Sequence, residues 1–144
     1  MGGKGLDFIR LSEEHMAELW PLQRAYKAEI GEECPAEADL ASLGRAIQSG
    51  KILFFGCREE GRLVACCSVS PTFSTFNYQT SGVFEDFFIL PAYRHRGIAR
   101  RLVQFAWQES GVSSLTVGCA DCDEEMYKAL GFRLRLGNLY AYEA

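Results

Sequence analysis

The stretch Glu-Asp-Phe-Phe-Ile-Leu-Pro-Ala-Tyr-Arg-His-Arg-Gly-Ile-Ala-Arg-Arg-Leu, residues 85–102, decides how this chain folds. Its apolar first half predicts a buried strand, and the loop that follows opens a helix near Gly97. The loop is basic, because Arg94, His95 and Arg96 follow one another. A glycine at the start of the helix lets the main chain come close to a ligand.

This strand, loop and helix form a candidate anion site. The first N–H groups of a helix have no partner within it, so they attract phosphate groups. Arg94, His95, Arg96 and Arg100 would add positive charge, which suits a phosphate or pyrophosphate. The alternative is an ordinary surface helix with solvated arginines. The glycine patterns of dinucleotide and nucleoside triphosphate loops do not occur in the sequence, so NAD and ATP lack their usual markers.

Hydrophobic periodicity on either side of this stretch predicts a mixed α/β sheet with helices on both faces. A strand at residues 83–90 is interrupted by Glu85-Asp86, and the loop before it, residues 71–82, is rich in aromatic residues. The other expected strands are 6–11, 51–58, 63–70, 112–117, 132–136 and 138–143, and the other expected helices are 12–26, 40–47 and 123–130. Together they predict one domain, residues 1–144, with about seven strands and about four helices.

Composition excludes several classes of protein. The formal net charge of −4 gives no basic surface for nucleic acid. No apolar run approaches the roughly 18 to 20 residues of a membrane span, and the first residues lack the apolar region of a signal peptide. Six cysteines include one pair with metal spacing, Cys119 and Cys122, but no second pair completes a site. Buried free thiols, no metal and a cytoplasmic location are expected.

The basic loop resembles the phosphate-loop motif of the GNAT superfamily of N-acetyltransferases. That motif is Gln/Arg-x-x-Gly-x-Gly/Ala, and Arg94-His-Arg-Gly97-Ile-Ala99 matches every specified position. The preceding Ile89-Leu-Pro91 and the later Tyr127-Lys-Ala-Leu-Gly-Phe132 are also similar to that family. The resemblance implies a GNAT-like fold and transfer of an acetyl group from acetyl-CoA, as co-substrate, to a primary amine. Phe73-Ser-Thr-Phe76 and residues 85–88 look most like its diamine (spermidine/spermine) acetyltransferase branch.

The resemblance also implies the cofactor contacts. The family's strand backbone at this position hydrogen-bonds the pantetheine arm of the coenzyme, and the loop and first helical turn hold its pyrophosphate. The residues that correspond here are Phe87, Phe88, Ile89, Arg94, His95, Arg96, Gly97, Ile98, Ala99 and Arg100. The asparagine that often touches the cofactor about seven residues before the family's tyrosine is replaced by Ala120, with Asp121 after it.

Two residues carry the implied chemistry. Glu85 corresponds to the glutamate proposed as general base in the diamine branch, and burial would have to raise its pKa for that role. The alternative is that Glu85 only attracts a cationic substrate. Regular strand alternation would place Asp86 on the other face. Tyr127 corresponds to the tyrosine that protonates the departing thiolate, and its alternative role is packing.

These observations predict an acetyl-CoA-dependent N-acetyltransferase that acts by direct attack in a ternary complex. The acceptor would be a small polyamine-like or amino-acid-like amine. A catalytically silent acyl-CoA-binding sensor or assembly domain is the alternative, and a nucleotide-binding regulator is a third. Phe73, Phe76 and Tyr78 would line the acceptor pocket or form an apolar lid. An open sheet edge near the last strand would make a homodimer plausible.

Overall fold

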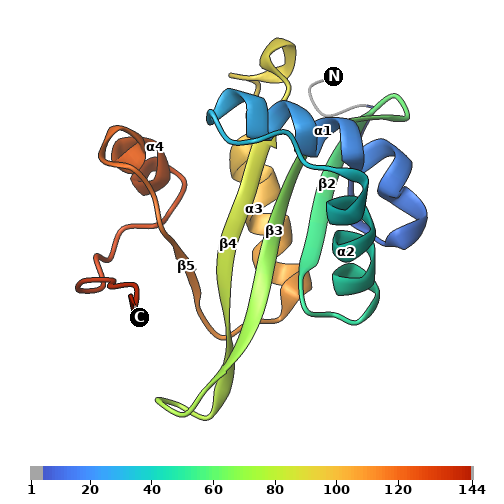
Figure 1. Cartoon of the computed structure of the whole chain (residues 1–144). Helices are drawn as coiled ribbons and strands as arrows, with labels where there is room; N and C mark the ends of the chain where they lie inside the picture. Colours follow the sequence, from blue (N-terminus) through green and yellow to red (C-terminus); the bar gives the residue numbers. More distant parts are fainter. Residues whose placement is uncertain (1–4, 144) are drawn as a thin grey trace.

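The computed structural model describes residues 5–143. Its centre is a five-stranded sheet in which spatial order follows chain order (Figure 1). The strands are β1 (Leu6–Leu11), β2 (Leu53–Glu59), β3 (Arg62–Ser74), β4 (Gln79–Ile89) and β5 (Leu115–Val117). Neighbours from β1 to β4 are antiparallel, and β5 runs parallel to β4. The sheet is therefore mixed, as the sequence predicts.

Helices cover both faces of the sheet. The helices are α1 (Met16–Glu29), α2 (Glu37–Gln48), α3 (Ile98–Ser110) and α4 (Glu124–Ala129), with short 3₁₀ turns at Glu13–His15, Pro91–Tyr93 and Asp121–Asp123. α1 and α2 lie on one face and α3 on the other, while α4 lies beyond β5 (Figure 1). A parallel β4–β5 pair needs a crossover, and α3 supplies it.

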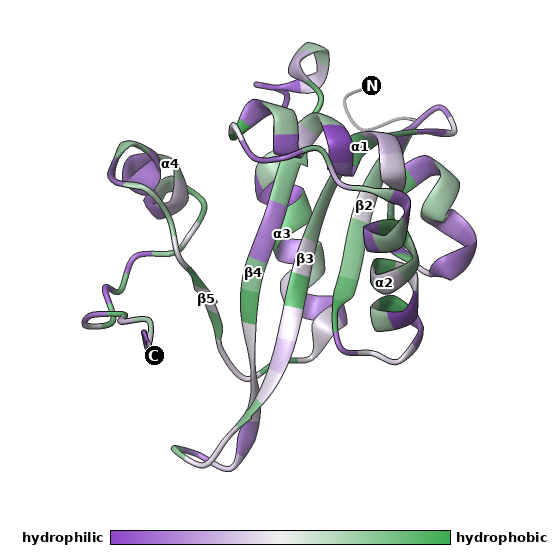
Figure 2. Cartoon of the chain, in the orientation of Figure 1, coloured by the Kyte–Doolittle hydropathy of each residue, from purple (hydrophilic) through white to green (hydrophobic). Residues whose placement is uncertain are grey.

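Two apolar cores result from the alternation of side chains along the central strands. Phe54 points into the cluster under α1 and α2, and its neighbour Phe55 points into the cluster under α3; both are fully buried. β2 and β3 are apolar along almost their whole length because both faces are covered (Figure 2). α3 places Ile98 and Leu102 in the second core, and Gly97 is its N-cap.

The expectation of about seven strands is wrong, because the sheet has five. Residues 132–136 and 138–143 form no strand, although Phe132, Leu134 and Leu136 alternate with polar residues. A strand needs a hydrogen-bonded neighbour as well as a pattern, and no described strand lies alongside this segment. The strand expected at 112–117 is also shorter, since only Leu115–Val117 pairs with β4.

Residues 71–82 are not a loop. β3 continues to Ser74 and β4 begins at Gln79, with Pro71 opposite Gly82 and Phe73 opposite Thr80. Pairing across the hairpin supplies the main-chain hydrogen bonds, so the proline and the serines do not end the strand. The hairpin therefore projects beyond the body of the sheet (Figure 1).

The helices of the described residues are all too short or too polar to cross a membrane.

We predict that Gly82→Ala destabilises the fold. A Cβ atom built at Gly82 would lie 2.6 Å from Cγ1 of Val69 and 3.1 Å from Cγ1 of Val112, so β4 or the core under α3 must shift. The expected cost is about 1–3 kcal/mol of unfolding free energy, measured by urea denaturation. Gly44→Ala in α2 is the matched control, because no atom lies within 4 Å and alanine favours a helix. Equal stability of the two variants would contradict this account.

Candidate active site

The sheet opens between β4 and β5. The two strands pair only from Gly82–Leu115 to Phe84–Val117, and β4 then continues to Ile89 without β5 beside it (Figure 1). Within the described residues, the main chain of Phe87, Phe88 and Ile89 has no strand partner on that side. This opening lies where the sequence predicts contact with an extended pantetheine arm.

The N-terminus of α3 is built to receive an anion. Gly97 is the N-cap with φ +82°, and no side chain caps the helix, so the first N–H groups of α3 lack an intrahelical partner. His95 also has a positive φ, +63°, which turns the loop sharply before the helix. A side chain at position 97 would meet no atom within 4 Å, so glycine is needed there for its backbone conformation and not for space.

The arginines of the loop are held by protein groups. Arg94 donates from Nη2 to both carboxylate oxygens of Glu29, at 2.8 and 2.9 Å, and from Nε to the carbonyl oxygen of Ile89 at 2.8 Å. Arg96 lies 3.5 Å from a carboxylate oxygen of Glu59. These side chains brace the loop against α1 and β2. The main-chain N–H groups are therefore the unpaired donors of the anion site.

Arg100 connects the anion site to α4. Its Nη2 atom donates to the carbonyl oxygen of Ala129, at the last turn of α4, over 2.9 Å. This bond satisfies one of the carbonyl groups that a helix leaves unpaired at its end. It also fixes α4 beside the opening, which positions the tyrosine that the sequence singles out.

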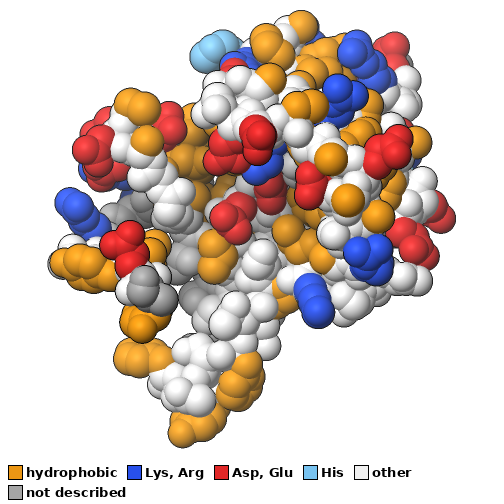
Figure 3. Space-filling view, viewed as in Figure 1, with side chains coloured by type: hydrophobic (Ala, Val, Ile, Leu, Met, Phe, Trp, Pro, Cys, Tyr) orange, Lys and Arg blue, Asp and Glu red, His pale blue; other side chains and the backbone are white. Residues whose placement is uncertain are grey.

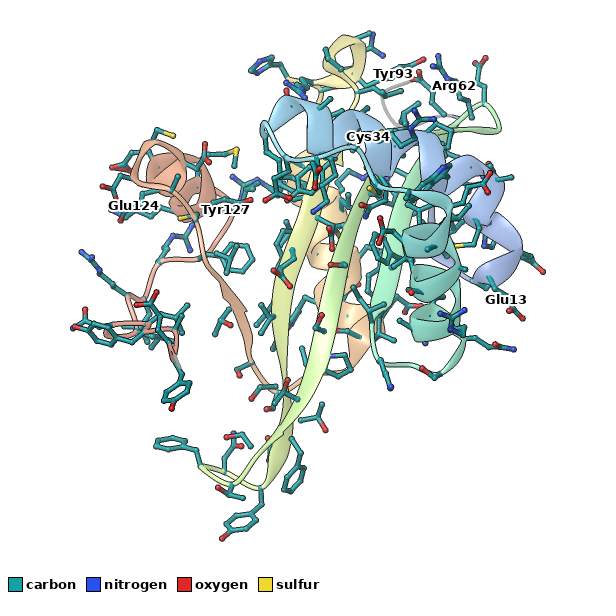
Figure 4. All side chains as sticks on the ribbon, viewed as in Figure 1. Glu13, Cys34, Arg62, Tyr93, Glu124 and Tyr127 are labelled. Carbon is teal, nitrogen blue, oxygen red and sulfur yellow. The ribbon has the colours of Figure 1, made fainter. Side chains whose placement is uncertain are left out.

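Tyr127 lies across the opening from β4. Its ring packs 6.2 Å from the ring of Phe87 and 5.8 Å, edge-on, from that of Phe132 (Figure 4). Burial raises the pKa of Tyr127 to about 12, and the nearby Asp123 carboxylate adds to the effect. The phenol is therefore protonated at neutral pH and can donate a proton. Ala120 and Asp121, before α4, are both exposed, so no amide occupies the position of the family's asparagine.

β4 contains a bulge at its acidic pair. From Ser68 to Cys66 β3 advances two residues, while β4 advances three, from Glu85 to Phe88. Asp86 adopts φ +54° as the extra residue. The regular alternation assumed from the sequence therefore fails here.

The bulge directs Asp86 toward α1. Its Oδ2 atom accepts a 2.6 Å hydrogen bond from the hydroxyl of Ser68, and its Oδ1 atom accepts a 3.4 Å bond from the amide of Gln23 on α1. Ser68 and Gln23 are both buried. Glu85 is exposed, so the burial required to raise its pKa is not present. Asp86 is the functional candidate that the sequence argument set aside, because a bulge leaves no mark in hydrophobic periodicity.

An acidic cleft of about 600 Å³ adjoins Asp86. It carries four carboxylates and one ammonium group, Lys27, which pairs with Glu32 at 2.7 Å. Acidic side chains gather near the middle of this face (Figure 3). The residues that line the cleft are Trp20, Gln23, Lys27, Glu32, Glu33, Cys34, Pro35, Asp39, Leu43, Phe54 and Asp86. An excess of negative charge favours a cationic ligand.

Tyr26 of α1 is a further candidate that sequence reasoning missed. Its ring packs 6.2 Å from that of Phe88 on β4. Burial, followed by the charge of Asp86, raises the pKa of Tyr26 to about 12. The only sequence signal was its place in the apolar stripe of α1, which equally indicates packing.

Neither a metal site nor an aromatic pocket wall forms. The described residues hold no group of three or more side chains placed to bind a metal ion, and Cys119 and Cys122 are exposed free thiols. Three of the six cysteines are buried as expected, and the other three are exposed. Phe73, Phe76 and Tyr78 do not line the acidic cleft, because they lie at the exposed end of the β3–β4 hairpin.

Comparison with known proteins agrees with the acyltransferase that this fold and site define. Residues 50–134 match the model of the acetyltransferase (GNAT) domain, which is more than half of the 144-residue chain. The chain therefore belongs to the GNAT acetyltransferase family, whose members use acetyl-CoA. No curated protein sequence matches it.

Solved structures share the fold. A probable acetyltransferase aligns with a TM-score of 0.83 and 20% identity, covering 96% of this chain and 97% of that one. An aminoglycoside acetyltransferase from an uncultured soil metagenomic sample, in complex with sisomicin, aligns with a TM-score of 0.84 and 14% identity, covering 100% and 99%. A predicted acetyltransferase with acetyl-CoA from Clostridium acetobutylicum gives 0.77 and 13%, covering 95% and 96%.

We predict that Glu29 and a bound coenzyme compete for Arg94. Glu29→Gln removes the charge that holds the guanidinium, so CoA should bind roughly 2–5-fold more tightly, while Arg94→Met should weaken binding on the order of tenfold. Isothermal titration calorimetry with CoA measures both. Glu125→Gln is the control, because its partner Lys128 lies on the same exposed helix. Weaker binding by Glu29→Gln would contradict the competition.

Proposed function

We propose that this protein transfers the acetyl group of acetyl-CoA to a primary amine of a small cationic acceptor. The observation that carries the proposal is the junction at Asp86, where the acidic cleft meets β4 beside the opening toward β5. The uncapped N-terminus of α3 suits the diphosphate of the coenzyme, and the opening suits its extended arm. The two binding regions therefore meet at the strand that carries the acidic pair.

The two acidic residues of β4 suit different tasks. A carboxylate that already accepts two hydrogen bonds is fixed in place and is a weaker base, so Asp86 holds the ammonium group of the acceptor. Glu85 is exposed and is adjacent in the chain, so it takes the proton through a water molecule. The freed amine nitrogen then bonds to the thioester carbonyl carbon.

Tyr127 completes the transfer. As the carbon–sulfur bond breaks, the sulfur leaves as a thiolate and takes the phenolic proton of Tyr127. With a pKa raised to about 12, the phenol keeps this proton throughout the neutral range. The products are the acetylated amine and CoA, so no metal ion and no covalent enzyme intermediate are needed.

The cleft narrows the class of acceptor. Polyamines and aminoglycosides both carry several ammonium groups, which match the carboxylates of Glu32, Glu33 and Asp39 better than a zwitterionic amino acid would. The resemblance of residues 73–76 and 85–88 to the diamine branch supports the same class. Six free cysteines agree with a reducing compartment, so we place the reaction in the cytoplasm.

We expect thiol release from acetyl-CoA to be fastest with polycationic amines. In a panel of spermidine, an aminoglycoside, neutral amino acids and a peptide N-terminus, read with a thiol reagent, the first two should have the highest kcat/KM. Their advantage should shrink as salt rises, because the cleft attracts them by charge. CoA binding without turnover of any amine would instead favour a silent acyl-CoA-binding domain.

Substitutions in β4 separate binding from proton removal in the same assay. Asp86→Asn should raise KM at least about tenfold with a small change in kcat, whereas Glu85→Gln should lower kcat roughly 100-fold. Glu33→Gln, at the rim of the cleft, is the matched control and should change KM only slightly. The opposite pattern, with kcat lost in Asp86→Asn alone, would make Asp86 the base.

We predict that Tyr127→Phe lowers kcat by about 10-fold to 100-fold, while CoA affinity measured by calorimetry changes less than about twofold. The rings pack equally well, so only the proton is lost. Because a raised pKa keeps the phenol protonated until the pH nears 12, ionisation of Tyr127 should not lower activity between pH 7 and 10. Tyr78→Phe, exposed on the hairpin, is the control. Undiminished turnover would remove Tyr127 from the mechanism.

A further inference from the structure

The end of the chain is apolar but makes no core. Residues 132–143, the terminal segment, include five large side chains that are 66–97% exposed: Leu134, Leu136, Leu139, Tyr140 and Tyr142. Within the described chain, no main-chain hydrogen bond involves residues 133–143. Large exposed apolar patches are uncommon on monomers and mark interaction surfaces.

A second apolar group lies at the hairpin tip, residues 73–78. Phe73, Phe76 and Tyr78 are 63%, 97% and 73% exposed. The hairpin tip and the terminal segment project from the body of the molecule at the same end of the view in Figure 3. Neither group adjoins the acidic cleft. The acetyl-transfer site therefore does not account for their exposure.

The sheet itself has an open side next to this end. β5 is the last strand in the sheet order, and it pairs with β4 alone. Residues 132–136 alternate apolar and basic side chains, with Arg133 and Arg135 between the apolar positions, which is the pattern of a strand with one covered face. One chain thus carries both an unpaired edge and a strand-like segment that lacks a neighbour.

We propose that a second copy of this chain covers this face, and that each copy lays residues 132–142 along the outer edge of β5 of the other. A two-fold arrangement uses the same surface on both copies, so the edge and the segment are satisfied together. The five exposed side chains of the terminal segment would bury on the order of 700 Å² per copy, near the roughly 800 Å² of a standard interface. The hairpin tip adds to that area.

Sedimentation velocity on the full chain from about 1 to 100 µM tests the proposal. We expect a dimer, and we expect Leu134→Lys and Phe76→Lys each to weaken it at least about 30-fold, because each change occurs twice in the interface. Both side chains are already exposed, so circular dichroism and Tm should stay unchanged. Trp107→Lys, at a half-exposed position on α3, is the matched control and should leave the dimer intact.

Hydrogen exchange identifies which surface forms the dimer. Amides of residues 115–117 and 132–142 should be protected in the wild-type protein and lose protection in Leu134→Lys. A monomer at 100 µM would overturn the proposal, including a monomer whose terminal segment is protected within its own chain. A dimer that survives Leu134→Lys, or one whose terminal segment exchanges freely, would overturn it as well.

Discussion

The extra residue in β4 sets the use of both faces of the sheet. In a regular strand Phe84 and Phe88 would share a face, but the bulge at Asp86 sends Phe84 to the core under α3 and Phe88 to the core under α1 and α2. The same shift turns the carboxylate of Asp86 toward Gln23. A single backbone irregularity thus supplies two cores and places a charge where α1 meets the sheet.

The opening beside β4 depends on how few residues pair with β5. Three residue pairs hold β5 to the sheet, and α4 is attached beyond them through the bond from Arg100 to the carbonyl of Ala129. The family's reaction needs space for an extended thioester between these strands and a proton donor at its far side. Early separation of β4 and β5 provides the space, and the attachment of α4 holds Tyr127 beside it.

The sequence predicted those parts of the fold that depend on local pattern. The strand, loop and helix of residues 85–102 are confirmed, with Gly97 as N-cap, because glycine conformation and helix periodicity are local properties. The bulge at Asp86 escaped prediction, since an extra residue becomes visible only against its partner strand. Residues 132–143 were predicted as strands from their alternation, but pairing depends on a neighbour that the pattern does not specify. The partners of Arg94 and Arg96 lie on α1 and β2, far away in the chain.

The bond between Arg94 and Glu29 has a thermodynamic consequence for the order of events in the site. Glu29 is the last residue of α1, and the segment that begins three residues later supplies Glu32, Glu33 and Cys34 to the acidic cleft. A coenzyme that draws Arg94 away would release this end of the helix, so occupancy of one region changes the free energy of ligand capture in the other. Linkage is reciprocal, and an acceptor that rearranges the cleft would alter coenzyme affinity by the same factor.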